Sequence, residues 1–291
     1  MRHFLPLALL CVVLVVEAGC LPSSQKQNTR SLTPGDSLSR EIAAGIPVDT
    51  LEFVWEATVP SETPMELPTS LIWSADSTAG RLFVADTRGG CIHVLSESGD
   101  HLGVWESDDF EFPYLAGSRG DSIAVFSRGR NRLDFVTNGA IGRSLDLPVE
   151  DISAVLVNET AIFAKRTEEG AFDMMQVSEQ GDIRQRYALA GPYWRHFGFI
   201  RQAGDSILSL SGYRPVVDIL MPDTPDGATL DTLALVGFDS PQLLRSHQFM
   251  LEEVDEPPLL VSSAAWHNDK LYVINLRTDH IRIDVYGMDG R

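Results

Sequence analysis

The stretch from Leu71 to Glu106 reads LIWSADSTAGRLFVADTRGGCIHVLSESGDHLGVWE and decides the fold. Each of its apolar runs is about as long as an ordinary strand, and turns rich in Gly, Ser and Asp separate the runs. This alternation predicts an antiparallel unit whose strands run up, down, up and down. The predicted strands are Leu71–Ala75, Arg81–Asp86, Cys91–Ser96 and His101–Glu106.

The same unit recurs along the chain. Its second strand reads LFVAD, IAVFS, AIFAK, ILSLS and LYVIN in turn, and successive copies begin about 40 residues apart, as in four-stranded propeller blades. The last interval is longer by about twenty residues, so we expect an insertion with helical character at Val236–Pro258. The remaining predicted strands are Tyr114–Arg119, Ser122–Ser127, Arg132–Thr137, Ala140–Leu147, Ile152–Asn158, Thr160–Arg166, Phe172–Ser178, Ile183–Leu189, His196–Gln202, Ser206–Gly212, Val216–Pro222, Ala228–Leu235, Leu259–His267, Lys270–Leu276 and Arg282–Gly287.

The pattern predicts an all-β chain whose residues 49–291 form a β-propeller of four-stranded antiparallel blades. A β-sandwich could also space its strands evenly, but it need not repeat one unit, so the repetition favours the propeller. Four complete blades and three strands of a fifth are predicted. A further strand at Leu51–Val59 resembles the outer strand His101–Glu106 and could close a ring. We favour an incomplete six-bladed ring over a closed five-bladed one.

The units resemble the six-bladed, NHL-like β-propellers of secreted bacterial lipoproteins. The resemblance rests on Gly80–Asp86, Ile92–Leu95 and Ser98–Asp100, and it recurs more loosely at Lys270–Asn275 and Ile281–Gly290. These motifs are structural, so the resemblance implies a fold and leaves the activity open.

The N-terminus has a short basic start, then an apolar run from Phe4 to Val16, as in a signal peptide. Ala18-Gly19-Cys20 resembles a lipoprotein cleavage site, although Glu17 stands where an apolar residue is expected. This resemblance implies a signal peptide at 1–19, lipidation of Cys20 and a polar tether at 20–48. It places the protein in the bacterial cell envelope, on the outer membrane. Cleavage after Ala18 would instead give a periplasmic or secreted protein.

Charge and cysteine content narrow the partners. The chain has 291 residues and a net charge of −18, which disfavours binding to nucleic acid. Of its three cysteines, Cys11 and Cys20 lie in the N-terminal segment. The remaining one, Cys91, begins a predicted strand and is interpreted as a small buried hydrophobe.

No motif of a metalloprotease, nucleotide-binding loop or serine hydrolase occurs in the sequence. We therefore predict no catalytic residue, no metal site and no cofactor. The acidic clusters at Asp108–Glu111 and Glu252–Glu256 are interpreted as solvated surface charge. Asp86 is interpreted as a residue that closes a turn.

One pattern suggests a binding site. Every loop between second and third strands carries arginine, and aromatic residues precede two blades. Arginine forks suit carboxylate, phosphate or sulfate, although these arginines could instead pair with nearby acids and hold loops together. The candidate ligand-binding residues are Arg88, Arg128, Arg166, Arg214, Arg277, Tyr114, Trp194, Arg195 and His196; Arg130, Phe110, Phe112 and Tyr193 lie beside them.

The sequence thus predicts an exported, lipid-anchored propeller that acts as a non-catalytic binding module. Its partner would be a protein, a peptide or an anionic small molecule at the channel face, and its lipid would hold it to the membrane. The alternative is an enzyme of the propeller lyase, lactonase or glycosidase kind. That alternative requires carboxylates or a metal at the channel, where the predicted loops are rich in arginine.

Overall fold

The computed structural model describes residues 45, 55–57, 59–74, 80–168, 171–189, 196–222, 229–256, 258–276 and 281–287. The predicted signal peptide 1–19, Cys20 and, except for Gly45, the tether 20–48 lie outside these ranges. So do the candidate site residues Trp194, Arg195 and Arg277. Within the described ranges, no helix has the length and apolar character needed to cross a membrane.

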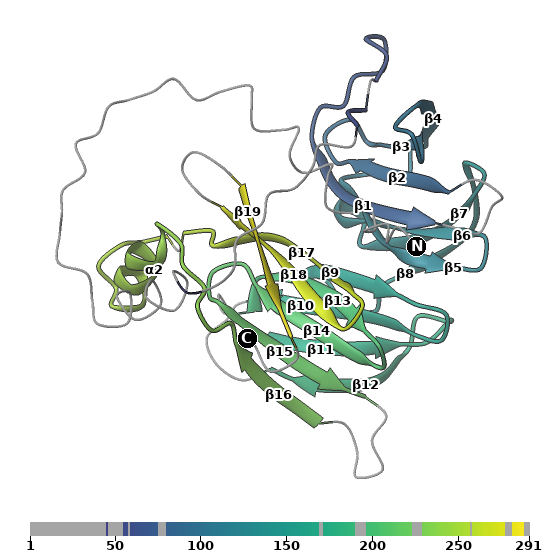
Figure 1. The fold of residues 1–291 in the computed structure, drawn as a ribbon. Helices are drawn as coiled ribbons and strands as arrows, with labels where there is room; N and C mark the ends of the chain where they lie inside the picture. Colours follow the sequence, from purple (N-terminus) through teal and green to yellow (C-terminus); the bar gives the residue numbers. More distant parts are fainter. Residues whose placement is uncertain are drawn as a thin grey trace. The chain divides into compact units, whose positions relative to one another are not determined.

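The first of two compact units includes Leu51–Ala188 and contains three blades (Figure 1). A blade is here a set of three or four consecutive strands, each antiparallel to the next. Blade 1 is a separate sheet, whereas blades 2 and 3 are joined in one eight-stranded sheet. Blade 1 consists of β1 (Pro68–Ser74), β2 (Arg81–Asp86), β3 (Cys91–Ser96) and β4 (His101–Glu106). Blade 2 consists of β5 (Pro113–Arg119), β6 (Ser122–Ser127), β7 (Arg132–Thr137) and β8 (Ala140–Asp146), with a 3-10 turn, η3 (Arg128–Arg130). Blade 3 consists of β9 (Ile152–Val157), β10 (Ile162–Glu168), β11 (Ala171–Val177) and β12 (Ile183–Ala188).

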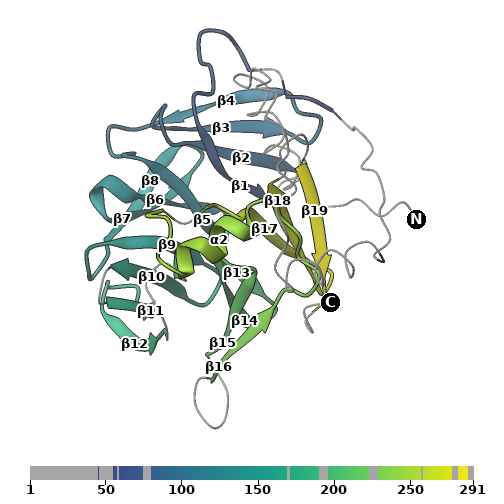
Figure 2. The ribbon, with the colours of Figure 1, turned by 90° about the vertical axis from the view of Figure 1, so that its left-hand side faces the viewer.

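The second unit includes Leu189–Arg291 and contains blades 4 and 5. Figure 2 shows the strands of blade 4 next to one another in chain order. The carbonyl of Gly212 accepts hydrogen bonds from the amides of Leu260 and Val261, at 2.7 and 3.1 Å, and so links the two blades. Blade 4 consists of β13 (Gly198–Ala203), β14 (Ser206–Ser211), β15 (Val216–Met221) and β16 (Thr229–Ala234); α2 (Leu243–Met250) follows, and then β17 (Val261–His267), β18 (Lys270–Leu276) and β19 (Ile281–Tyr286) of blade 5.

The two faces of blade 1 are both covered, which explains why its central strands are almost wholly apolar. Phe83 and Ala85 pack toward Ile123 of blade 2 on one face. Leu82 and its neighbours on the other face pack against Trp55 and other side chains that precede β1. Side chains alternate between the faces of a strand, so a strand buried on both sides must be apolar at successive positions.

The first strands of blades 2 and 3 pair in parallel at one position, where Gly117 lies opposite Val157. The φ of Gly117 is 147°, and a Cβ placed there would lie 2.0 Å from the carbonyl oxygen of Val157. Only glycine allows the two backbones to come so close. The contact therefore depends on this residue and fixes how the first strand of blade 2 lies against the first strand of blade 3.

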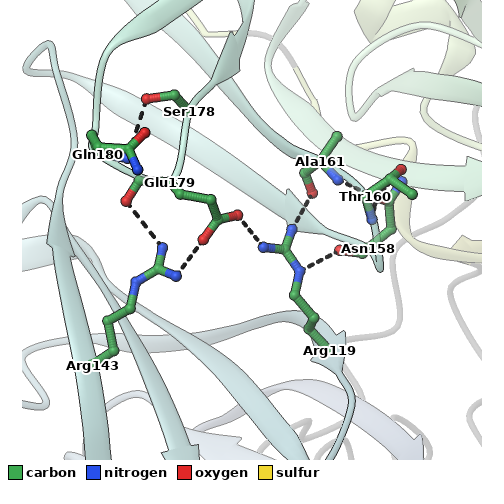
Figure 3. A network of polar contacts seen from close by, with 8 residues as sticks. All are labelled: Arg119, Arg143, Asn158, Thr160, Ala161, Ser178, Glu179 and Gln180. Atoms are coloured by element: carbon green, nitrogen blue, oxygen red, sulfur yellow. Dashed lines mark hydrogen bonds and ion pairs between the residues drawn. The ribbon is translucent and has the colours of Figure 1, made fainter.

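A charged network reinforces the same contact (Figure 3). Glu179, in the turn between β11 and β12, forms ion pairs with both Arg119 of β5 and Arg143 of β8. Arg119 also donates to the carbonyl oxygens of Asn158 and Ala161, at 2.8 and 3.0 Å. Its guanidinium thus joins three segments of the unit. Burial alone would raise the pKa of Glu179, but the arginines Arg143 and Arg119 hold it below its usual value.

The predicted strands are confirmed closely, with most boundaries within one or two residues, and the predicted helical insertion contains α2. The exception is Leu51–Val59. Its described residues, 55–57 and 59, are not in a strand, and Trp55 packs instead on Leu82, Val84 and Leu95 of blade 1. An indole that covers an apolar sheet face buries more surface there than it would at a sheet edge, which explains the difference.

Candidate functional site

Three side chains with metal-ligating atoms meet on one face of blade 1. Asp86 ends β2 and lies opposite Cys91, which begins β3. Residues directly opposite one another share a face, and so do residues two apart on one strand. His93 therefore lies on the same face as Asp86 and Cys91, the face that Trp55 covers further along. All three side chains are buried.

The distances define a compact group, called the blade-1 cluster and made of Asp86, Cys91, His93 and His101. The Sγ of Cys91 lies 3.5 Å from Nε2 of His93, and Oδ2 of Asp86 lies 3.9 Å from the same nitrogen. Nδ1 of His93 lies 3.3 Å from Nε2 of His101. The ligand atoms of Asp86, Cys91 and His93 all lie within 4.8 Å of one another.

Asp86 is held in place by the backbone. Its Oδ1 accepts hydrogen bonds from the amides of Leu67 and Gly89, each at 2.9 Å, and its Oδ2 accepts one from the amide of Glu66 at 2.5 Å. Burial alone would raise the pKa of Asp86, but these hydrogen bonds lower it below its usual value. The interpretation of Asp86 as a turn-closing residue is confirmed, and the carboxylate is a buried anion.

The same geometry argues against nucleophilic catalysis. Burial, with the carboxylates Asp86, Glu106 and Glu66 adding to it, raises the pKa of Cys91 to about 11, so the thiol is protonated near neutral pH. A nucleophile–histidine–carboxylate triad also needs the histidine to contact its two partners through different ring nitrogens. Here Nε2 of His93 faces both Cys91 and Asp86, and Nδ1 faces His101.

The prediction that Cys91 is buried is confirmed, since 8% of the residue is exposed. Its polar neighbour, the imidazole of His93, lies against the sulfur and was not foreseen from the sequence. The signal was present in the sequence. Asp86 and Cys91 flank one tight turn, which places them opposite each other, and His93 is two residues further along.

A second feature of the same unit is exposed. The turn after β2 and the turn after β6 both contact the segment that leads into β5: Thr87 donates to the carbonyl of Pro113 at 3.0 Å, and the amide of Arg128 donates to that of Phe112 at 3.3 Å. Arg88 and Arg128 are exposed in these turns. Phe112 lies between the turns along this segment and is 55% exposed. We call Arg88, Phe112 and Arg128 the Phe112 surface.

The backbone of Phe112 is unusual, with φ at 50°. A bulky residue in this left-handed region costs about 1–3 kcal/mol, and such strain is often found at functional positions. The flanking aromatics differ from it. Phe110 is buried, and Tyr114, which is only partly buried, packs against the core shared by blades 2 and 3.

Arginines beside this surface are already paired. Arg130 forms ion pairs with Asp109 at 2.6 Å and with Glu111 at 3.7 Å, and Arg132 pairs with Asp109 at 3.0 Å. This part of the acidic cluster Asp108–Glu111 is therefore bound to arginine as well as exposed to solvent. In the described part of the chain, neither the guanidinium of Arg88 nor that of Arg128 forms an ion pair.

The other candidate residues occupy different environments. Arg166 lies within β10 and pairs with Asp173 of β11 at 3.1 Å. His196 is buried, with Nδ1 3.5 Å from Oδ2 of Asp218. Arg214, in the turn after β14, is partly buried. Of the candidate arginines in the first unit, Arg88 and Arg128 flank one shared segment and Arg166 is held within its own blade. Their role in binding stays a prediction.

No known protein family and no curated protein matches the sequence. Solved structures do match. A putative exported protein from Bacteroides fragilis has a TM-score of 0.54 at 11% identity, over 81% of this chain and 72% of that one. Virginiamycin B lyase from Staphylococcus aureus has a TM-score of 0.49 at 14% identity, over 76% and 69%. Glutaminyl cyclase from Myxococcus xanthus has 0.48 at 14%, over 76% and 92%. Together with the repeated four-stranded sheets, the first likeness shows a β-propeller fold and excludes the sandwich alternative.

Proposed function

We propose that this β-propeller is an exported, lipid-anchored, non-catalytic binding module, and that the Phe112 surface is where it binds an anionic group carried on an apolar body. The observation that carries the proposal is the exposure of Phe112 in a strained conformation, beside turns that hold Arg88 and Arg128. A guanidinium binds carboxylate or phosphate through a planar fork, and an aromatic face binds the apolar part. Arg130 is paired with Asp109, whereas neither Arg88 nor Arg128 forms an ion pair among the residues that the structure describes.

The ligand test uses the full chain and simple probes. We expect hydrocinnamate and phenyl phosphate to bind in isothermal titration calorimetry, with benzyl alcohol as the uncharged control. Arg88→Ala and Arg128→Ala should each weaken binding about tenfold, which corresponds to ~1.4 kcal/mol. Arg184→Ala is the matched control, because Arg184 is an exposed arginine on β12 of blade 3. Equal affinity in the three variants would refute the proposal.

Export and anchoring have a separate test. The sequence signals that support them are the apolar run Phe4–Val16 and the cleavage pattern Ala18-Gly19-Cys20. In a bacterial host fed a labelled fatty acid, the full chain should incorporate label and sediment with membranes. Cys20→Ser should abolish incorporation, whereas Cys11→Ser should leave it unchanged. Label that persists in the Cys20 variant would count against lipidation, and protein retained in the cytoplasm would count against export.

A further inference from the structure

Blades 2 and 5 share an ion pair at one position of the ladder. In blade 2, Nε of Arg132 lies 3.0 Å from Oδ1 of Asp134, two residues further along β7. In blade 5, Nε of Arg282 lies 2.6 Å from Oδ1 of Asp284, two residues further along β19. Each arginine also reaches an aspartate in the segment before its blade, Asp109 or Asp239 respectively. In both blades a guanidinium thus lies between two carboxylates, one on its own strand and one in the segment before the blade.

The register identifies the corresponding residues of blade 1. Val84 and Val125 are the third residues of the repeated second-strand runs LFVAD and IAVFS. His93 lies opposite Val84, and Asp134 lies opposite Val125, so His93 and Asp134 occupy the same position in their blades. Cys91 accordingly stands where blade 2 has Arg132 and blade 5 has Arg282. His93 takes the place of the paired aspartate, and blade 1 instead has a buried carboxylate on the neighbouring strand, where Asp86 lies opposite Cys91. Within the described residues no lysine or arginine pairs with Asp86, so the cation that the other two blades supply is missing from this one.

We infer that the blade-1 cluster binds a divalent transition-metal ion of the zinc class, through Sγ of Cys91, Nε2 of His93 and Oδ2 of Asp86. The ion takes the electrostatic role that the guanidinium plays in blades 2 and 5. Thiolate and imidazole are the ligands that such ions prefer, and a carboxylate commonly joins them.

The distances fit tetrahedral coordination. Zinc binds sulfur at about 2.3 Å and nitrogen or oxygen at about 2.0–2.2 Å, so two ligand atoms at a tetrahedral angle lie roughly 3.3–3.6 Å apart. The separation of 3.5 Å between Cys91 and His93 falls within this range, and that of 3.9 Å between His93 and Asp86 is slightly wider. All three ligand atoms lie within 4.8 Å of one another, so an ion between them requires the carboxylate of Asp86 to move inward.

The surroundings already orient the ligands. Nδ1 of His93 lies 3.3 Å from Nε2 of His101, and Nε2 of His93 faces Cys91 and Asp86. When an ion binds Nε2, the ring proton is on Nδ1 and is donated to His101. Such a partner behind a ligating histidine fixes its tautomer and its ring orientation. The backbone amides of Leu67, Gly89 and Glu66 do the same for the carboxylate. Ligands fixed in advance lose little entropy when the ion binds.

Two exposed glutamates are neighbours of the ligands along the backbone. Glu106 on β4 is the register partner of Cys91, and Glu66 donates its amide to Asp86. One of these carboxylates or a water completes the tetrahedron. Binding releases the thiol proton of Cys91. With water as the fourth ligand, the thiolate and the carboxylate of Asp86 neutralise the charge of the ion. The inference does not depend on the proposed function, because the Phe112 surface and the blade-1 cluster share no residue.

The test uses Co²⁺ as a spectroscopic probe and Zn²⁺ as a competitor, added to the reduced full chain. We expect one equivalent of Co²⁺ to give a sulfur-to-metal charge-transfer band, which one equivalent of Zn²⁺ removes. Cys91→Ser should abolish the band, whereas Cys11→Ser and Cys20→Ser should keep it. His101→Phe should keep the band and weaken Zn²⁺ binding about 10–100-fold, because His101 orients a ligand without being one.

A second measurement keeps the test decisive if a variant folds poorly. Zn²⁺ should raise the melting temperature of the wild-type protein and should slow alkylation of Cys91 by iodoacetamide, located by peptide mapping. Three outcomes would overturn the inference: no stoichiometric Co²⁺ binding by the wild type, a charge-transfer band that survives Cys91→Ser, or Zn²⁺ protection that appears only at Cys11 or Cys20. The first outcome would leave Cys91 and His93 as a plain S–H···N hydrogen bond.

Discussion

Glu179 joins blades 2 and 3 through its two arginines, and replacing it by glutamine tests how much charge contributes to that junction. Glu179 is 36% exposed, and its partners Arg119 and Arg143 are 19% and 42% exposed. The more exposed pair contributes about 0–1 kcal/mol because water screens it. The better shielded pair with Arg119 contributes about 1 kcal/mol, less than the roughly 1.5–3 kcal/mol of a hydrogen bond to a charged group, because Glu179 is partly exposed to water. We therefore expect Glu179→Gln to cost about 1–2 kcal/mol at pH 7, or roughly 2–8 °C in melting temperature.

The cost should depend on pH in a definite direction. The folded-state pKa of Glu179 lies below its usual value, so folding favours the ionised form. Its contribution is complete above the unfolded pKa, about 4.3, and is lost as the pH falls through the lower folded pKa. The difference in stability between Glu179→Gln and the wild type should therefore be constant from pH 7 to about 5 and shrink below about 4.

Urea unfolding followed by tryptophan fluorescence, at several pH values, measures this difference. Glu97→Gln is the matched control, because Glu97 is an exposed glutamate in the β3–β4 turn of blade 1. Arg119→Ala should cost more than Arg143→Ala, since Arg119 also serves the carbonyls of Asn158 and Ala161. If Glu179→Gln matched the wild type at pH 7, or if its deficit were unchanged in acid, the electrostatic account of the junction would be wrong.

Three further substitutions test the packing, each by the midpoint of urea unfolding. Gly117→Ala should destabilise the protein by several kcal/mol, because the added Cβ would lie 2.0 Å from the carbonyl oxygen of Val157. Its control, Gly120→Ala, should cost only about 1 kcal/mol, because Gly120 has a φ of +52° but no atom within 4 Å of the added Cβ. Equal costs would contradict the close approach of the two backbones. Phe112→Gly should stabilise by up to about 1 kcal/mol through relief of a positive φ while weakening the binding of phenyl phosphate, and a loss of stability would show that the aromatic ring packs favourably. Phe126→Ala should cost about 3–5 kcal/mol, because the ring is 2% exposed in the core of blades 2 and 3, and a cost below 1 kcal/mol would place it outside that core.

The strand positions could be predicted because turn-forming residues separate the strands in the sequence. Runs such as LFVAD end at turns rich in glycine or aspartate. Glycine adopts the positive φ of a turn and aspartate bonds to the turn backbone, so these residues mark where a strand ends. The strand predicted at Leu51–Val59 is wrong at the described residues, 55–57 and 59. Its aromatic and β-branched composition suits a strand and also suits a segment that covers an apolar face, and composition does not distinguish the two. The position of Trp55 on blade 1 is set by tertiary packing.

The candidate arginines share only their distance along the chain from the second strand of each blade. They therefore include both arginines in turns and an arginine within a strand, Arg166. What an arginine does depends on its place in the ladder. Arg166 lies inside β10, opposite Asp173, so its charge is balanced within the blade. Arg132 and Arg282, which begin or nearly begin their third strands, form the repeated ion pair and were not among the predicted site residues.

Once the strand register is known, the repeat distinguishes arginines that pair within their blade from arginines that do not. An arginine on a strand, opposite or two residues from an aspartate, pairs with that aspartate, as Arg132, Arg166 and Arg282 do. Among the described residues, the turn arginines Arg88 and Arg128 form no ion pair, whereas Arg130 pairs with Asp109. By this criterion Arg88 and Arg128 remain available for binding. The criterion also isolates blade 1, where Cys91 and His93 replace the Arg132–Asp134 pair of blade 2 while Asp86 still provides a buried charge. Blade 1 thus replaces both partners of the repeated ion pair by metal-ligating side chains, beside a buried carboxylate that has no lysine or arginine partner among the described residues. The proposed ion, bound from solution, explains this departure.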